Sequence, residues 1–113
     1  MGGNCYSGFA KPSRHEPKAV VAEGLSATLR ETEEAWELDL TVPAAIANAS
    51  FAPVTTRLLG ETRLSAMAFE APNDSDYDLT TDLLGNTRTA VIPAGPFASL
   101  AAGRRTIRVW EKK

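Results

Sequence analysis

Cysteine and histidine are almost absent from this sequence of 113 residues, which contains only Cys5 and His15. A single cysteine cannot form an internal disulfide, so the hydrophobic core must hold the fold alone, as is usual in a reducing compartment. From residue 20 onward neither residue type occurs, which excludes nitrogen- and sulfur-ligated metal sites there. Cys5 and His15 lie in a glycine- and proline-containing stretch that lacks the rigid support a catalytic dyad needs. We therefore expect no enzyme activity.

Long apolar runs and nucleotide-binding motifs are missing as well. No stretch approaches the roughly 20 apolar residues of a membrane-spanning helix, and the N-terminus lacks the apolar segment of an export signal. No glycine-rich phosphate loop follows a predicted strand, and no nucleophile elbow is present. The sequence therefore predicts no membrane partner, no cofactor and no small-molecule substrate.

Neither sign of charge dominates the whole chain. Lysine and arginine number 12, aspartate and glutamate 14, and the net charge is −2. This balance argues against a dedicated nucleic-acid-binding protein. The charge is unevenly spread, because residues 1–19 carry three basic side chains and one acidic, whereas the remainder carries nine basic and thirteen acidic. The sequence therefore predicts a basic N-terminal segment attached to an acidic body.

The clearest structural pattern runs from Trp36 to Val42. Apolar and polar residues alternate strictly there, with Trp36, Leu38, Leu40 and Val42 on one side and Glu37, Asp39 and Thr41 on the other. A period of two predicts a strand with one buried and one solvated face. We expect this strand to be the centre of the domain and Trp36 to be buried.

Weaker alternation predicts further strands on both sides of this one. The expected strands cover 24–30, 54–59, 62–70, 77–83, 87–93 and 106–110, and residues 44–50 are expected to form either a turn or two of helix or a crossing loop. The first of them and the strand at 36–42 are expected to form an antiparallel hairpin. Close spacing with turn residues between the strands is typical of an all-β domain. We predict an immunoglobulin-like β-sandwich of seven or eight antiparallel strands over residues 20–113.

Residues 1–19 are predicted to form an extended N-terminal arm outside the sandwich. The arm has too few apolar side chains to fold alone, so we expect neighbouring molecules to order it. Its expected partner contacts are two aromatic anchors and three basic side chains: Tyr6, Phe9, Lys11, Arg14 and Lys18.

An acidic run follows the turn at 72–75. Asp74, Asp76 and Asp78 are spaced like the first three ligands of a calcium loop. The pattern then fails, because Leu79 occupies the glycine position and Gly85 the position of the closing glutamate. We interpret the run as a docking surface for a basic partner, and calcium binding remains the alternative.

The predicted last strand is basic, with Arg104, Arg105 and Arg108 as its candidate partner-binding residues and Lys112 and Lys113 beyond them. Three interpretations are open. The charges can guard an edge strand against aggregation, or bind a protein. Alternatively, Arg108 and Trp110 can share a face and stack on nucleic acid.

Two short segments of the C-terminal half carry a resemblance to a known family. Leu100 to Gly103 followed by Ile107 to Val109 is similar to a turn and strand of immunoglobulin-like sandwiches. Leu79 to Asp82 with Gly85 resembles a stretch in the immunoglobulin-like modules of tailed-phage virion proteins. The inter-sheet cysteine pair is absent, and arginines stand where the corner tyrosine would be. The resemblance implies an immunoglobulin-like fold and a role in an assembly, and no functional residues are carried over from it.

The acidic run and the basic last strand would let copies of the chain bind one another through surfaces of opposite charge. The sequence and the resemblance together predict a non-enzymatic structural protein, a capsid decoration protein or a head–tail or tail part of a tailed-phage virion, made in the host cytoplasm. Its expected partners are copies of itself and other structural proteins. The alternative is a stand-alone immunoglobulin-like binding module for a protein or glycan.

Overall fold

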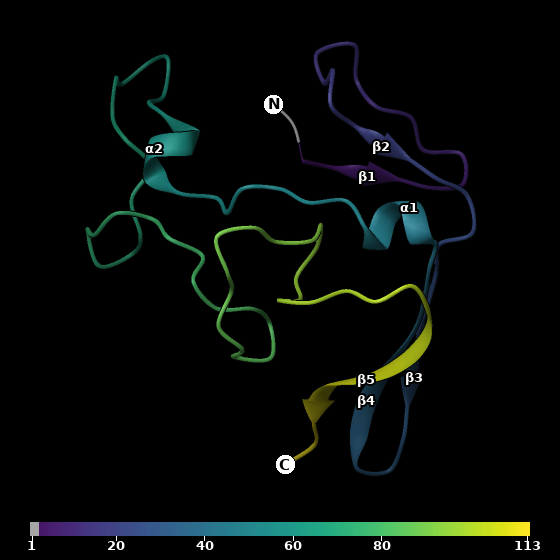
Figure 1. Ribbon diagram of the computed structural model, residues 1–113. Coiled ribbons are helices and arrows are strands. Elements are labelled where there is room, and N and C mark those ends of the chain that lie inside the picture. Colours follow the sequence, from purple (N-terminus) through teal and green to yellow (C-terminus); the bar gives the residue numbers. More distant parts are fainter. Residues whose placement is uncertain (1–2) are drawn as a thin grey trace.

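A three-stranded antiparallel sheet organises the structure, a computed structural model that describes residues 3–113 (Figure 1). The strand order is β3–β4–β5, with β3 at Ser26–Glu31, β4 at Ala35–Val42 and β5 at Gly103–Glu111. The predicted hairpin is confirmed, because β3 pairs with β4 through a turn at residues 32–34. The predicted central position of the strand at 36–42 is confirmed too, since β4 lies between the other two strands.

The alternation along β4 separates a polar face from an apolar face. On the polar face, Arg30 forms ion pairs with Glu37 at 2.8 Å and with Asp39 at 3.6 Å. Thr106 of β5 donates a hydrogen bond to Asp39 Oδ1 from the other side. On the apolar face, Leu40 and Val42 are buried, and Val42 retains only 2% of its surface.

The hydrophobic core lies on the apolar face of the sheet. Its buried residues are Leu40, Val42, Ile46, Phe97 and Ile107. Ile46 comes from α1, Ala44–Ala47, so of the two alternatives expected after Pro43 the structure has the helical turn. Partly buried side chains from both ends of the chain complete the core: Cys5, Val20, Ala22, Leu38, Ala47, Leu100 and Val109. Residues from the small and the large sheet therefore meet in one core.

Trp36 differs from the prediction because it is only half-buried. It lies opposite Glu31 of β3 and Trp110 of β5, near the start of β4, whereas α1 follows the other end of that strand. The buried residue at this end is Ala35, whose side chain is fully covered. The strand was predicted correctly, whereas its core residues are those nearer Pro43.

The N-terminal segment also differs from the prediction, because contacts within the chain hold it. β1, Cys5–Tyr6, pairs in parallel with β2, Val20–Val21, and forms a second sheet of two strands. Glu16 is buried and accepts hydrogen bonds from Asn4 and from the hydroxyl of Tyr6. The expectation that only neighbouring molecules order this arm is therefore wrong for residues 3–19, and residues 1–2 lie outside the described part of the chain.

Asp82 organises the approach to β5. Its carboxylate accepts hydrogen bonds from the backbone of Leu84, Asn86 and Ala98 at 2.7–2.9 Å, and a further one from the side chain of Asn86. Gly85, at a φ of +83° that favours glycine, closes the turn. The bond to Ala98 fixes the segment that inserts Phe97 into the core.

Residues 54–91 contain almost none of the predicted strands. In place of a strand at 54–59 there is a helical turn, α2 at Thr56–Leu59, because the Thr55 hydroxyl caps its N-terminus and Gly60 ends it. The remaining predicted strands at 62–70, 77–83 and 87–93 are reduced to single bridges, among them Glu61 with Ala68 and Thr81 with Thr87. The described chain is therefore all-β in class, with two small sheets and a long irregular segment.

Candidate functional site

The pairing of β4 with β5 places the two tryptophans of the chain opposite each other. The register shifts between Trp36 and Glu37, so that Trp36 lies opposite Trp110 and Glu37 lies opposite Arg108. Val109 is therefore the extra residue of a β-bulge. Bulges re-aim side chains, and this one brings both indoles to the same end of the sheet.

The tryptophan pair lines an open recess of about 460 Å³ together with Lys112 and Lys113. Trp110 exposes 68% of its surface. A large exposed aromatic side chain is typical of a binding surface, since its burial against a ligand removes much apolar area from water. The recess therefore offers an aromatic surface with cationic groups at its border.

An ion pair positions one of these cations. Lys112 Nζ lies 2.7 Å from Glu31 Oε1 of the neighbouring β3 end, and the Lys112 backbone donates to the carbonyl of Glu34. The side chain of Lys112 is therefore held across the end of the sheet. The recess border thus contains hydrogen-bond donors for a hydroxyl-bearing ligand, and the Glu31 carboxylate that holds Lys112 is an acceptor next to them.

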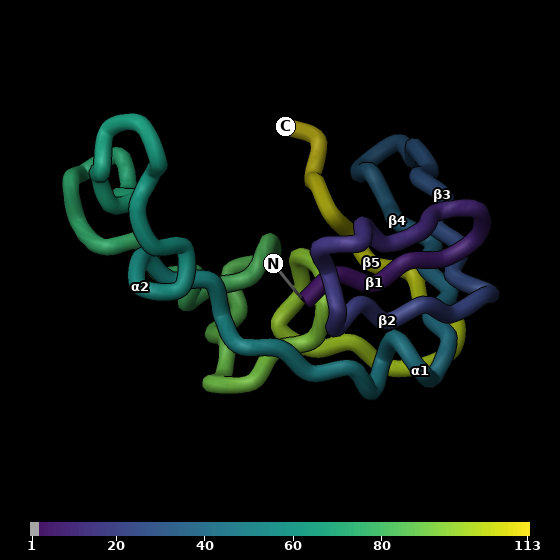
Figure 2. The backbone as a smooth tube through the Cα atoms, turned by 90° about the horizontal axis from the view of Figure 1, so that it is seen from above, coloured from purple at the N-terminus to yellow at the C-terminus, as the bar shows by residue number. Residues whose placement is uncertain are grey.

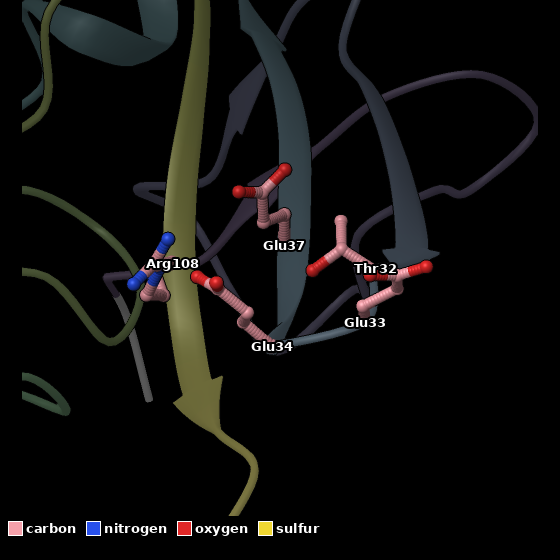
Figure 3. A pocket seen from close by; sticks show the side chains of 5 residues that line it. All are labelled: Thr32, Glu33, Glu34, Glu37 and Arg108. Atoms are coloured by element: carbon pink, nitrogen blue, oxygen red, sulfur yellow. The ribbon is translucent and has the colours of Figure 1, made fainter.

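A second recess lies on the polar face of the sheet. It is lined by Thr32, Glu33, Glu34, Glu37 and Arg108. Figure 3 shows the side chains of Glu34 and Glu37 between Arg108 and the turn that carries Thr32. Arg108 also pairs with Glu111 at 3.7 Å. This recess holds three carboxylates against the single guanidinium of Arg108, and no aromatic side chain lines it. We therefore regard the tryptophan recess, which combines aromatic and cationic groups, as the candidate site.

Hydrogen bonds rather than burial set the charge state of the polar face. The Thr106 hydroxyl lowers the pKa of Asp39, burial opposes that shift, and the guanidiniums of Arg30 and Arg104 add to the lowering. Asp39 therefore stays ionised and keeps Arg30 aligned on this face.

The basic residues predicted on the last strand do lie on β5, and all three are exposed. Arg104 lies opposite Thr41 and Arg105 opposite Leu40, so they point to different faces. The prediction that Arg108 and Trp110 share a face is wrong, because the bulge places them opposite consecutive residues of β4. The stacking platform proposed for nucleic acid is therefore not formed in this arrangement.

The predicted contacts of the N-terminal segment separate into two kinds. Tyr6 is half-buried and its hydroxyl is bonded to Glu16, so it anchors the segment internally. Phe9 is fully exposed, and the basic residues Lys11, Arg14 and Lys18 are exposed as well. These four remain predicted partner contacts.

The acidic residues Asp74, Asp76 and Asp78 are exposed on the irregular segment. The backbone of Asp76 bridges to Glu70 and that of Asp78 to Thr55, so these residues lie on different short bridges. Within residues 3–113, no group of three or more side chains with metal-binding chemistry comes together. In the same residues there is no helix of the length and apolar character needed to cross a membrane.

Sequence reasoning missed the tryptophan recess. The alternation at 36–42 and the expected strand at 106–110 were both recognised, but a bulge of one residue leaves no strong pattern in the sequence. A signal is nevertheless present, since these two predicted strands each carry one of the two tryptophans of the chain.

Comparison with known proteins gives one informative match. No family model matches the chain, and no curated protein matches it either. A solved structure described as the complex structure of XylC with xylose is similar, with a TM-score of 0.83 and 26% sequence identity. The match covers 96% of this chain and 17% of that one. Nearly the whole chain is therefore similar to a small part of a much longer protein that was solved with a sugar.

Proposed function

We propose that this chain is a non-catalytic all-β unit of a saccharide-binding or saccharide-processing protein, and that the recess between Trp36 and Trp110 contacts the sugar. The observation that supports this proposal is the exposed Trp110 paired with the half-buried Trp36, on a fold similar to that of a chain solved with xylose. The proposal develops the glycan-binding alternative drawn from the sequence.

The chemistry of the recess suits a sugar ring. A pyranose presents carbon–hydrogen bonds on its faces and hydroxyl groups around its edge. An indole face packs against the former, while ammonium and carboxylate groups bond the latter. The recess provides Trp110 as the aromatic surface and Lys112, paired with Glu31, as the polar border. Because it is open on one side, a longer saccharide could extend beyond it.

The proposal is limited to binding. The chain spans 17% of the XylC chain it matches, so an activity of the longer protein does not transfer to this unit. A tailed-phage virion component remains a prediction from the sequence resemblance. An immunoglobulin-like sandwich of seven or eight strands also remains a proposal, which would require residues 54–91 to gain strand pairing from a covering partner.

Titration with sugars tests the proposal. Xylose and soluble xylo-oligosaccharides should shift the indole resonances of Trp36 and Trp110 in NMR spectra, with smaller shifts for glucose. Trp110→Ala should abolish the response, whereas Phe9→Ala, which removes an even more exposed aromatic side chain elsewhere, should leave it unchanged. Absence of any indole shift at saturating oligosaccharide, or equal shifts in the Trp110→Ala protein, would contradict the proposal.

A further inference from the structure

Residues 54–91, which we call the lobe, extend away from the core and bury almost nothing. Figures 1 and 2 both show the first part of this segment, with α2, projecting from the side of the molecule opposite β3. Its last part returns to the body of the molecule, where Asp82 and Leu83 bond to Ala98 and Pro96. Asp82 is the only buried residue in it. Its large apolar side chains are exposed: Leu58, Leu59, Leu64, Met67, Phe69, Leu79, Leu83, Leu84 and Val91.

The exposed area is too large for a compact monomer. A folded chain of 12.1 kDa should expose about 6,000 Å², whereas this chain exposes 8406 Å². The radius of gyration is 16.2 Å, against about 13 Å for a compact domain of this length. The surplus of roughly 2,400 Å² exceeds what one partner contributes to an ordinary interface, about 800 Å². The lobe therefore has the surface of a segment that a partner covers.

Charge indicates what kind of partner fits. Residues 64–82 contain five carboxylates and no basic side chain. Asp82 is buried, which leaves Glu70, Asp74, Asp76 and Asp78 exposed around Met67, Phe69 and Leu79. A matching surface must combine apolar area with positive charge, because like charges across an interface cost several kcal/mol.

Such positive charge is present on β5 of the same chain. Arg104 and Arg105 are exposed, and neither forms a salt bridge within residues 3–113. β5 is also an edge strand of its sheet, so its outer backbone groups are available to a partner. In Figure 1, α2 and the chain that follows it lie away from β5, so a contact between these two surfaces as they stand joins two copies.

We propose that the lobe of one copy docks along the exposed edge of β5 of a second copy, with Asp74, Asp76 and Asp78 near Arg104 and Arg108 on one side of that edge and Arg105 on the other. Each copy then uses two different surfaces: its lobe contacts one neighbour, and its β5 surface contacts another. Two contacts of about 800 Å² each fit within the surplus area. Contacts of this head-to-tail type close into rings or continue as filaments. The inference is independent of sugar binding at the tryptophan recess.

Sedimentation velocity over a range of protein and salt concentrations tests the contact in the absence of sugar. We expect association that rises with protein concentration and weakens as salt increases. The lobe variant Asp74→Lys/Asp76→Lys/Asp78→Lys and the strand variant Arg104→Glu/Arg105→Glu/Arg108→Glu should each be monomeric. An equimolar mixture of the two should associate again, because each reversed surface finds its complement. Lys11→Glu/Arg14→Glu/Lys18→Glu, which reverses exposed charges elsewhere, should associate like the wild type.

A second measurement needs no variants. Carbodiimide treatment of mixed ¹⁴N- and ¹⁵N-labelled wild-type protein should yield intermolecular crosslinks between lobe carboxylates and Lys112 or Lys113, which lie at the end of β5. A wild-type protein that stays monomeric at every concentration and yields no such crosslinks would overturn the proposal. So would a mixture of the two folded variants that fails to associate.

Discussion

The carboxylate of Asp82 accepts a hydrogen bond of 2.8 Å from the backbone N–H of Ala98, sixteen residues further along the chain. This bond joins the irregular lobe to the segment that carries Phe97 into the core. Burial alone would raise the pKa of Asp82. Hydrogen bonds from Ala98, from the side chain and backbone of Asn86 and from Leu84 outweigh burial and lower it from the ordinary 3.8 to about 2.

Asp82→Asn should destabilise the protein above pH 4 and flatten its acid response. A carboxylate whose folded pKa is lowered stabilises the fold fully above its unfolded pKa and loses that contribution as the pH falls toward the folded value. We therefore expect the thermal midpoint of the wild type to fall between about pH 4 and pH 2, with a smaller fall in the variant. Asp76→Asn, at an exposed carboxylate, is the control. Parallel midpoint curves for the wild type and Asp82→Asn would contradict the assignment.

Glu16→Ala should release the N-terminal segment. The carboxylate holds Asn4 and Tyr6, and the hydroxyl of Tyr6, working against burial and together with Asn4, lowers its pKa. Without it, the backbone bonds from Val20 to Asn4 and from Ala22 to Tyr6 should open more often. Hydrogen exchange at these two amides should accelerate, with Glu23→Ala as the exposed control. Unchanged protection would show that β1 and β2 pair without Glu16.

Ile107→Ala should cost about 2–5 kcal/mol in the free energy of unfolding, because it empties a position at the centre of the core. Leu58→Ala, at an exposed position of α2, should change it by less than about 0.5 kcal/mol. Denaturant unfolding of dilute protein measures both. Equal costs would mean that the lobe contributes as much to stability as the sheet, contrary to its exposure.

The thiol of Cys5 should react slowly in the folded protein. Burial raises its pKa, so the reactive thiolate is scarcer than in a free cysteine. Alkylation by iodoacetamide at pH 8 should therefore be slower for native than for urea-unfolded protein. Glu16→Ala should move the native rate toward the unfolded one. A native rate equal to the unfolded rate would show that Cys5 is not protected by packing against the core.

The sheet could be predicted from the sequence because its signal is local. Because apolar and polar residues alternate strictly from Trp36 to Val42, only one face of this strand can pack against the core. A shift of the strand pairing by one residue would bury Glu37 and Asp39. The hairpin partner at Ser26–Glu31 lies directly before this strand in the sequence, and the apolar residues of β5 are sufficient to predict a strand there.

The lobe and the candidate site could not be predicted in the same way. Alternation at 62–70 resembles a strand, but a strand needs a paired neighbour, and the chain supplies a single bridge between Glu61 and Ala68. Thr55 and Gly60 convert the stretch before it into a capped helical turn. The tryptophan recess depends on a bulge at Val109, which is fixed by pairing across the sheet and not by the neighbours of Val109 in sequence.

The position of β5 in the chain affects how the protein is made. β4 pairs with β3 across a turn of three residues. On its other side β4 pairs with β5, and the partner of Val42 there is Gly103, which is synthesised 61 positions later (42 to 103). At about 5–20 residues per second, a ribosome needs roughly 3–12 seconds to synthesise that interval. During this time the hairpin leaves one edge of β4 and the apolar side chains Leu40 and Val42 uncovered. Translation speed and the availability of chaperones therefore govern how many nascent chains reach the native sheet before that edge pairs with another polypeptide.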